Sequence, residues 1–342
     1  MPGAGFFLHI LLFFMAFMLL SLILPAAALA WGPGVHMTVG NWVLQNLAAL
    51  PPDIAEALMR YPGQYLHGGL SADIFIGKGS KAKKGHSHNW ESGLDLLSKA
   101  DNLRRKSYAL GYLSHLAADT VAHNVYVPGT FNSAPGSGRL AHVYIEWHAD
   151  ASLKWDCKDA RGVFHEAGSL ASERILRQTI HQKAWQFWLK KHIYERSISL
   201  GGSRGMRGYL AMMDRLFPGQ ERLELLDYML TLSTRGIVSV LRDLENSPVL
   251  GLDPIGADAL SLAGGKRLKN NGRNRRGLII GSIRNLMHKP APVPPDLEIS
   301  LPVPKNPQIE IIVPDLMRDF PPVCTPDSFF GTENEPQRDY SR

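Results

Sequence analysis

The chain has 342 residues, of which 45% are hydrophobic and 20% are charged. This composition is typical of a folded globular protein with enough apolar residues for a sizeable core, and it excludes an intrinsically disordered chain. The net charge of +6 favours anionic partners, a class that includes both phospholipid headgroups and nucleic acids.

The first thirty residues differ from the rest of the chain. Residues 6–24 are almost wholly apolar and are followed by Pro25 and an Ala-rich stretch that ends at Ala30. This pattern predicts a signal peptide over residues 1–30, although no Lys or Arg precedes the apolar run. We therefore expect a secreted or periplasmic protein that begins at Trp31. The alternative is a membrane-anchored protein, because an uncut run of this length could span a bilayer.

Apolar residues then recur at helical spacing as far as about residue 246. The periodic segments are residues 54–60, 94–99, 103–121, 169–191 and 221–244. Pro51 and Pro52 should end a first helix, and Asp53 is a candidate cap for the second. The sequence predicts an all-α domain over residues 31–285.

Composition changes after this domain. Six basic residues fall within 266–276, and twelve of the 23 prolines lie between Pro290 and Pro336. The basic stretch reads as a solvated loop, with lipid or polyanion binding as the alternative. We expect residues 286–342 to form a proline-rich C-terminal tail. Two cysteines occur, Cys157 and Cys324, and they could pair in an oxidising compartment or remain separate thiols.

Histidines and carboxylates recur every four residues in two predicted helices. Such residues project from one face of a helix, and their nitrogen and oxygen atoms are ligands that zinc accepts. Burying them among leucines would be costly without a partner, and a metal ion would remove that cost. The first run is His115, Asp119 and His123, and the second is His142, Glu146 and Asp150.

Further candidate ligands precede these helices. Asp73 follows Gly68 and Gly69, and we expect it where a loop meets an apolar segment. His86 and His88 compete for one ligand position. Trp31 would offer a free α-amino group and its own carbonyl if the signal peptide is cut, and His36 follows closely.

Taken in order, these residues resemble the ligands of the zinc-dependent phospholipases C. Fungal single-strand nucleases share that scaffold but usually carry Asp in place of the final Glu. The resemblance covers roughly residues 31–150, and the later helices suit the family's all-α body. It implies three zinc ions, bound by the residues Trp31, His36, Asp73, His88, His115, Asp119, His123, His142 and Glu146.

The resemblance also implies how these residues are shared. The first zinc would be bound by Asp73, His88, His115 and Asp119, and the second by His123, His142 and Glu146. The third would take the amino group and carbonyl of Trp31 with His36, and Asp119 would bridge to it. His88 is preferred over His86 because Trp90 follows it closely, as a large side chain does in the family. Asp119 and His123 are four apart, whereas the family more often has six, so His123 is the least typical member of the set.

We expect such a protein to hydrolyse phosphodiesters, with Asp73 orienting or deprotonating the attacking water. The favoured substrate is a phospholipid, cleaved to diacylglycerol and a phosphorylated headgroup during transient contact with a membrane surface. No stable nucleic acid partner is expected. The alternatives are a single-strand nuclease, which would need an aromatic platform for the bases, and a non-enzymatic membrane-associated protein without bound zinc.

Overall fold

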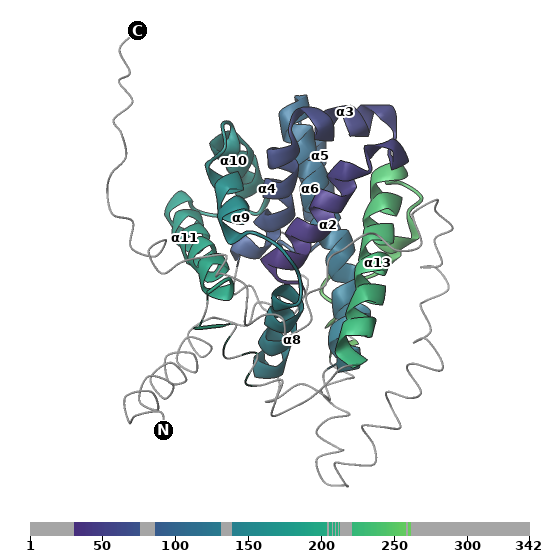
Figure 1. The fold of residues 1–342 in the computed structure, drawn as a ribbon. Coiled ribbons are helices and arrows are strands. Elements are labelled where there is room, and N and C mark those ends of the chain that lie inside the picture. Colours follow the sequence, from purple (N-terminus) through teal and green to yellow (C-terminus); the bar gives the residue numbers. More distant parts are fainter. Residues whose placement is uncertain are drawn as a thin grey trace.

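The computed structural model describes residues 31–75, 86–130 and 139–260, except for residues 204, 207, 209, 211, 213–220 and 258. These residues form helices joined by turns and loops, without an extended strand, so the all-α prediction is confirmed (Figure 1). Within the described part, no helix is long and apolar enough to cross a membrane. The predicted signal peptide, the basic stretch at 266–276, the proline-rich tail and Cys324 lie outside the described residues, whereas Cys157 is buried.

The described α-helices are numbered as in Figure 1. They are α2 (Pro33–Gln45), α3 (Pro52–Arg60), α4 (Pro62–Ser71), α5 (Trp90–Ser98), α6 (Leu103–Val121), α7 (Val127–Thr130), α8 (Arg139–Ala151), α9 (Cys157–Gly162), α10 (Ser169–Thr179), α11 (Ala184–Gly201) and α13 (Glu221–Arg242). Short 3₁₀ helices lie at Leu47–Ala49, Ala72–Phe75, Val163–His165 and Pro248–Gly251, and a π-helical turn lies at Ala122–Tyr126.

Helix α6 is the central element of the fold. Asn102 caps its start, since the Asn102 side chain accepts a hydrogen bond from the backbone N–H of Arg105 at 3.0 Å. Every residue from 107 to 121 is buried, because α2, α3, α4, α5 and α13 all pack against α6 (Figure 1). A polar residue between positions 107 and 121 therefore faces the protein interior whichever way it points.

Glycines allow α4 and α6 to cross closely. A Cβ atom on Gly68 would lie 1.9 Å from the carbonyl oxygen of Tyr108, and one on Gly111 would lie 1.9 Å from that of Tyr65. Only glycine fits at either position. This crossing brings the end of α4, and the 3₁₀ helix that follows it, against the middle of α6.

The structure differs from the sequence-based expectation in three places. Asp73 lies in the 3₁₀ helix that continues α4, so the segment before it is helical and not a loop. Asp53 does not cap α3; Pro51 occupies the cap position, and the Asp53 carboxylate pairs with Lys106 of α6 at 2.7 Å. The periodic segment 169–191 is two helices, since His181 takes a left-handed backbone conformation with φ of 54° between α10 and α11.

Candidate metal centre

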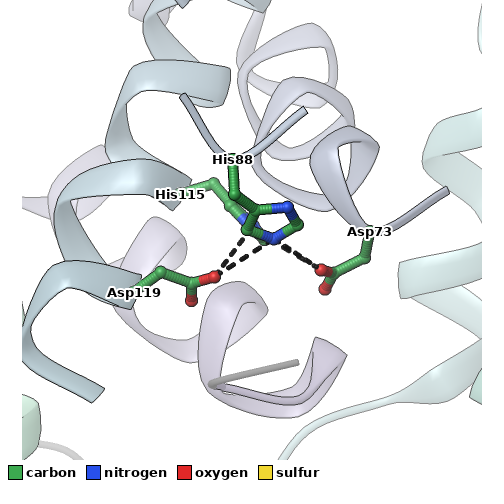
Figure 2. Close-up of side chains that lie close together, drawn as sticks. All are labelled: Asp73, His88, His115 and Asp119. Atoms are coloured by element: carbon green, nitrogen blue, oxygen red, sulfur yellow. Dashed lines mark hydrogen bonds and ion pairs between the residues drawn. The ribbon is translucent and has the colours of Figure 1, made fainter. Parts of the chain in front are cut away.

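Four buried side chains meet beside the middle of α6. They come from the 3₁₀ helix after α4, from the loop before α5 and from α6 itself, and they are Asp73, His88, His115 and Asp119 (Figure 2). One ligand atom from each lies within 4.8 Å of the other three. This quartet is the set that the resemblance assigned to the first zinc.

The distances within the quartet are short. The Nε2 atom of His88 lies 3.1 Å from Oδ1 of Asp73 and 3.3 Å from Oδ2 of Asp119 (Figure 2). The Nε2 atom of His115 lies 3.2 Å from the same Asp119 oxygen and 3.1 Å from Nε2 of His88. Two imidazole nitrogens and two carboxylates thus surround one small volume.

Outer contacts fix the orientation of the two imidazoles. The Nδ1 atom of His115 lies 2.8 Å from the carbonyl oxygen of Gly69. Because a carbonyl oxygen only accepts hydrogen bonds, Nδ1 of His115 carries a proton, and in the neutral ring Nε2 presents its lone pair to the quartet. The Nδ1 atom of His88 lies 3.1 Å from Oγ of Ser87, whose own carbonyl accepts a hydrogen bond from the Tyr112 hydroxyl.

Asp119 also reaches a third histidine. Its Oδ1 atom lies 3.3 Å from Nε2 of His36 on α2, while its Oδ2 atom faces His88 and His115. The imidazoles of His36 and His115 stack with their centroids 4.0 Å apart. Oδ1 of Asp119 therefore faces His36, whereas Oδ2 faces His88 and His115.

Trp31 is anchored on the backbone of α6, at the residue before Asp119. Its indole Nε1 donates hydrogen bonds to the carbonyl of Ala118, at 3.0 Å, and to Oγ of Ser233, at 3.2 Å. Its ring stacks on Tyr126 with a centroid separation of 4.7 Å, and the side chain is fully buried. The residue that would begin the mature chain thus lies beside the turn of α6 that carries Asp119.

Asp150 has a different place from the one its spacing suggested. Instead of extending the second ligand run, its Oδ1 atom accepts a hydrogen bond from the backbone N–H of Val35 at 2.9 Å. A carboxylate at a helix N-terminus satisfies a free backbone donor and complements the helix dipole. Asp150 therefore ties α8 to the start of α2 and holds His36 in position.

The second predicted set is only partly assembled. The Nε2 atom of His142 lies 3.1 Å from Oε1 of Glu146, and the rings of His123 and His142 are 5.6 Å apart. His123 lies in the π-helical turn after α6, and its Nδ1 atom is 2.6 Å from the carbonyl oxygen of Pro254. Within the described part of the chain, only the first quartet gathers its ligand atoms within 4.8 Å.

His86 is not a member of either group. It is buried, and its Nδ1 atom accepts a hydrogen bond from the backbone N–H of His88 at 3.1 Å. This contact braces the loop while the His88 ring enters the quartet. The geometry therefore favours His88 as the ligand.

The charges of the centre are strongly coupled. Burial lowers the pKa of His88, but the carboxylates of Asp119 and Asp73 outweigh it and raise the pKa to about 10. Burial raises the pKa of Glu146 well above its usual range, and the nearby charges of Asp73 and Asp119 add to this. Burial lowers the pKa of His123 to about 4, so this side chain is neutral at pH 7. The carboxylates of Asp73 and Asp119 thus favour a positive charge at the position of His88.

Several buried atoms of the centre have no hydrogen-bond partner among the described residues. They are Nε2 of His36, Nε2 of His123, both oxygens of Asp119 and both oxygens of Glu146. Apart from Nε2 of His123 and Oε2 of Glu146, these atoms lie 3.1–3.3 Å from another atom of the centre without the geometry of a hydrogen bond. A buried polar atom without a hydrogen bond costs roughly 1–3 kcal/mol, and a bound cation would remove that cost. Imidazole nitrogens with carboxylate oxygens form the usual donor set of a catalytic zinc site, and the residues fit such an ion.

Sequence reasoning missed one contact of this centre. The hydroxyl of Tyr194, on α11, lies 3.4 Å from Oδ2 of Asp73, opposite the face that Asp73 turns to His88. Tyr194 is more than one hundred residues from Asp73 in the chain, and no spacing pattern links the two.

Comparisons with known proteins agree with this geometry. A family model described as zinc dependent phospholipase C matches residues 35–199. The match begins just before His36 and runs through α8 to α11. No curated protein and no solved structure matches the chain.

Proposed function

Residues 35–199 belong to the zinc-dependent phospholipase C family, and from this premise we propose that the chain hydrolyses phospholipids to diacylglycerol and a phosphorylated headgroup. The observation that carries the proposal is the position of Asp119, whose two oxygens face His36 on one side and His88 with His115 on the other.

We assign the ligands accordingly. Asp73, His88, His115 and Asp119 would hold one zinc ion, and His36 with Asp119 and the backbone of Trp31 would hold another. His123, His142 and Glu146 would close around the third. The distances in the first group support its assignment most directly. The side chains of His123, His142 and Glu146 would need to move closer together to bind an ion.

Zinc in such a centre would supply Lewis acidity, which lowers the pKa of water to about 7 and neutralises charge on the phosphoryl oxygens. The protein's own residues do the positioning. Asp73 is buried, is held by Tyr194 through Oδ2, and presents Oδ1 to the centre. It is placed to accept a proton from water in the centre, which makes it the proposed general base.

We also propose that the chain is secreted and cut after Ala30. The buried indole of Trp31 is anchored on the carbonyl of Ala118, the residue before Asp119, so a free amino group at Trp31 would be a candidate ligand. An uncut chain would have an amide nitrogen there, which is a poor metal ligand.

The test compares substrates and a matched pair of variants. The purified protein is assayed on phosphatidylcholine vesicles and on single-stranded DNA, each with and without a zinc chelator. We expect lipid hydrolysis that the chelator abolishes, and loss of that activity in Asp119→Asn. The control is Asp101→Asn, whose exposed carboxylate contacts the nearby side chains of Asn102 and Arg105. Full turnover in Asp119→Asn would overturn the proposal. Hydrolysis of DNA without hydrolysis of lipid would show instead that the protein is a nuclease.

A further inference from the structure

Helix α11 exposes an apolar face to solvent. Its exposed large apolar residues fall at helical spacing, three, four and eight residues after the first, so they share one side of the helix. They are Trp185, Trp188, Leu189 and Ile193, and they are 62%, 60%, 46% and 42% exposed. We call this set the tryptophan face. Two exposed tryptophans on adjacent turns are unusual on a soluble protein surface, and such patches mark sites of interaction.

The opposite side of α11 packs on the protein body and reaches the metal centre. Phe187, Tyr194 and Ile198 are buried against the protein body. Tyr194 donates its hydroxyl hydrogen bond to Asp73, the proposed general base. A helix with side chains is about 10–12 Å across, so the tryptophan face lies about one helix diameter from the centre.

The charges on α11 identify the partner that suits this face. The exposed charged side chains of the helix and its N-cap are basic, namely Lys183 and Arg196, and His192 is exposed beside them. The single acidic residue of the helix, Glu195, is buried and lies near Lys191 and His165. An apolar face flanked by cations matches a phospholipid surface with anionic headgroups.

The two tryptophans also favour a phospholipid surface as the partner of this face. Its ring is amphipathic and concentrates at the boundary between headgroups and acyl chains, where the indole N–H stays in a polar layer. The ring of Trp188 stacks on His192 with centroids 4.1 Å apart, which places an aromatic and a titratable polar group side by side at the surface. A protein partner or a second copy of the chain would not require this flanking positive charge.

We propose that α11 is a membrane-docking helix. It lies along a phospholipid surface with the tryptophan face in the interfacial layer and with Lys183 and Arg196 against anionic headgroups. This deepens the proposed function, on which it rests for the identity of the lipid as substrate. The docking itself requires only the surface described above.

The test measures binding without turnover. The intact, zinc-loaded protein is sedimented with vesicles of phosphatidylcholine and phosphatidylglycerol analogues in which a glycerol C–P bond replaces the hydrolysable ester. We expect the wild-type protein to bind these vesicles, to bind less tightly as salt is added, and to shift its indole emission to the blue. The double variant Trp185→Ala/Trp188→Ala should bind at least about tenfold more weakly, because it removes the two largest interfacial side chains.

Two further variants make the result specific. Met59→Ala removes a side chain of similar exposure (65%) on α3 and should bind as the wild type does. Lys183→Glu/Arg196→Glu should lose the preference for the anionic lipid. Equal zinc content and circular dichroism among all proteins establish that they are folded.

Three results would overturn the docking proposal. They are absence of vesicle binding by the wild type, wild-type binding by the tryptophan double variant, or a dimer in size-exclusion chromatography that the double variant abolishes without any vesicle binding. Because the analogues cannot be cleaved, a protein that docks but hydrolyses no lipid would contradict the proposed function alone. If the wild-type protein hydrolyses lipid and the tryptophan double variant binds vesicles as tightly as the wild type, the docking proposal alone is contradicted.

Discussion

His36 and Asp119 face each other across the junction of α2 and α6, with Nε2 of the histidine 3.3 Å from Oδ1 of the carboxylate. Neither atom has a hydrogen-bond partner among the described residues. A metal ion between the two atoms would satisfy both of them. Oδ2 of Asp119 faces His88 and His115 instead. We therefore expect that a mutation can remove the metal ion at His36 without removing the one at the quartet.

Replacement of His36 should therefore remove one metal ion and leave the quartet intact. In His36→Ala we expect the zinc content to fall by about one ion per chain, whereas Asp119→Asn should lose more, because both of its oxygens are used. Elemental analysis of purified proteins measures the difference. The control is His165→Ala, whose side chain is 63% exposed. Equal zinc loss in His36→Ala and Asp119→Asn would contradict the bridging role.

The close crossing of α4 and α6 should be sensitive to a single methyl group. Gly111→Ala would place a Cβ atom 1.9 Å from the Tyr65 carbonyl, so the helices must separate. We expect a loss of about 1–3 kcal/mol of stability, with weaker zinc binding because Asp73 follows α4. Gly162→Ala, in α9, is the matched control, since its Cβ would meet no atom within 4 Å. Thermal unfolding compares them; an unchanged melting temperature in Gly111→Ala would show that the crossing is looser than described.

Tyr194→Phe isolates the hydrogen bond that positions Asp73. The ring stays buried, so stability should change little, while the Asp73 carboxylate loses its outer contact at Oδ2. Removal of such contacts around metal sites typically costs about 10–100-fold in activity or metal affinity. We expect kcat to fall by about tenfold. Steady-state kinetics of this variant and of Tyr228→Phe, which alters an exposed tyrosine on α13, provide the comparison. Equal kcat values in the two variants would exclude a positioning role for Tyr194.

A second buried charge cluster, away from the metal centre, should govern acid stability. Lys191 lies 2.6 Å from Glu173, which also lies 3.3 Å from His67. Burial acts to raise the pKa of Glu173, but His67 and Lys191 outweigh it and hold the pKa below 4.5. A depressed folded-state pKa stabilises the protein above the unfolded value, and this contribution is lost as the pH falls through the folded value.

Glu173→Gln should thus lower stability at pH 7 and flatten its decline below about pH 4.5. Urea unfolding at a series of pH values measures both effects. Glu56→Gln is the control, because its ion pair with Arg60 is solvent-exposed and such pairs contribute roughly 0–1 kcal/mol. A pH dependence in Glu173→Gln that parallels the wild type would rule out this source of acid sensitivity.

Much of the fold and the centre follows from local patterns. The four-residue spacing of His115 and Asp119 places both on one face of α6, which the structure confirms, and the boundaries of α6 match the periodic segment. The α4 segment was not predicted because Gly68 and Gly69 have low helix propensity and read as a loop. Glycine is needed in α4 because of a tertiary contact, the close approach of α6, and a single sequence carries no sign of that contact.

Other features depend on long-range contacts as well. Asp150 has the spacing of a ligand but binds the N-terminus of α2, because that helix packs against α8. Tyr194 reaches Asp73 only after α10 and α11 separate at His181, where a left-handed residue breaks an otherwise continuous helical pattern. His123, in the π-helical turn, likewise contacts the carbonyl of Pro254, which lies far along the chain.

We infer that this chain holds a multinuclear zinc centre that the amino group of Trp31 completes. The most direct test is the zinc content of the purified secreted protein, measured together with its N-terminal sequence. We predict close to three zinc ions per chain in a protein that begins at Trp31. A protein that begins at Trp31 and retains no zinc would contradict the account.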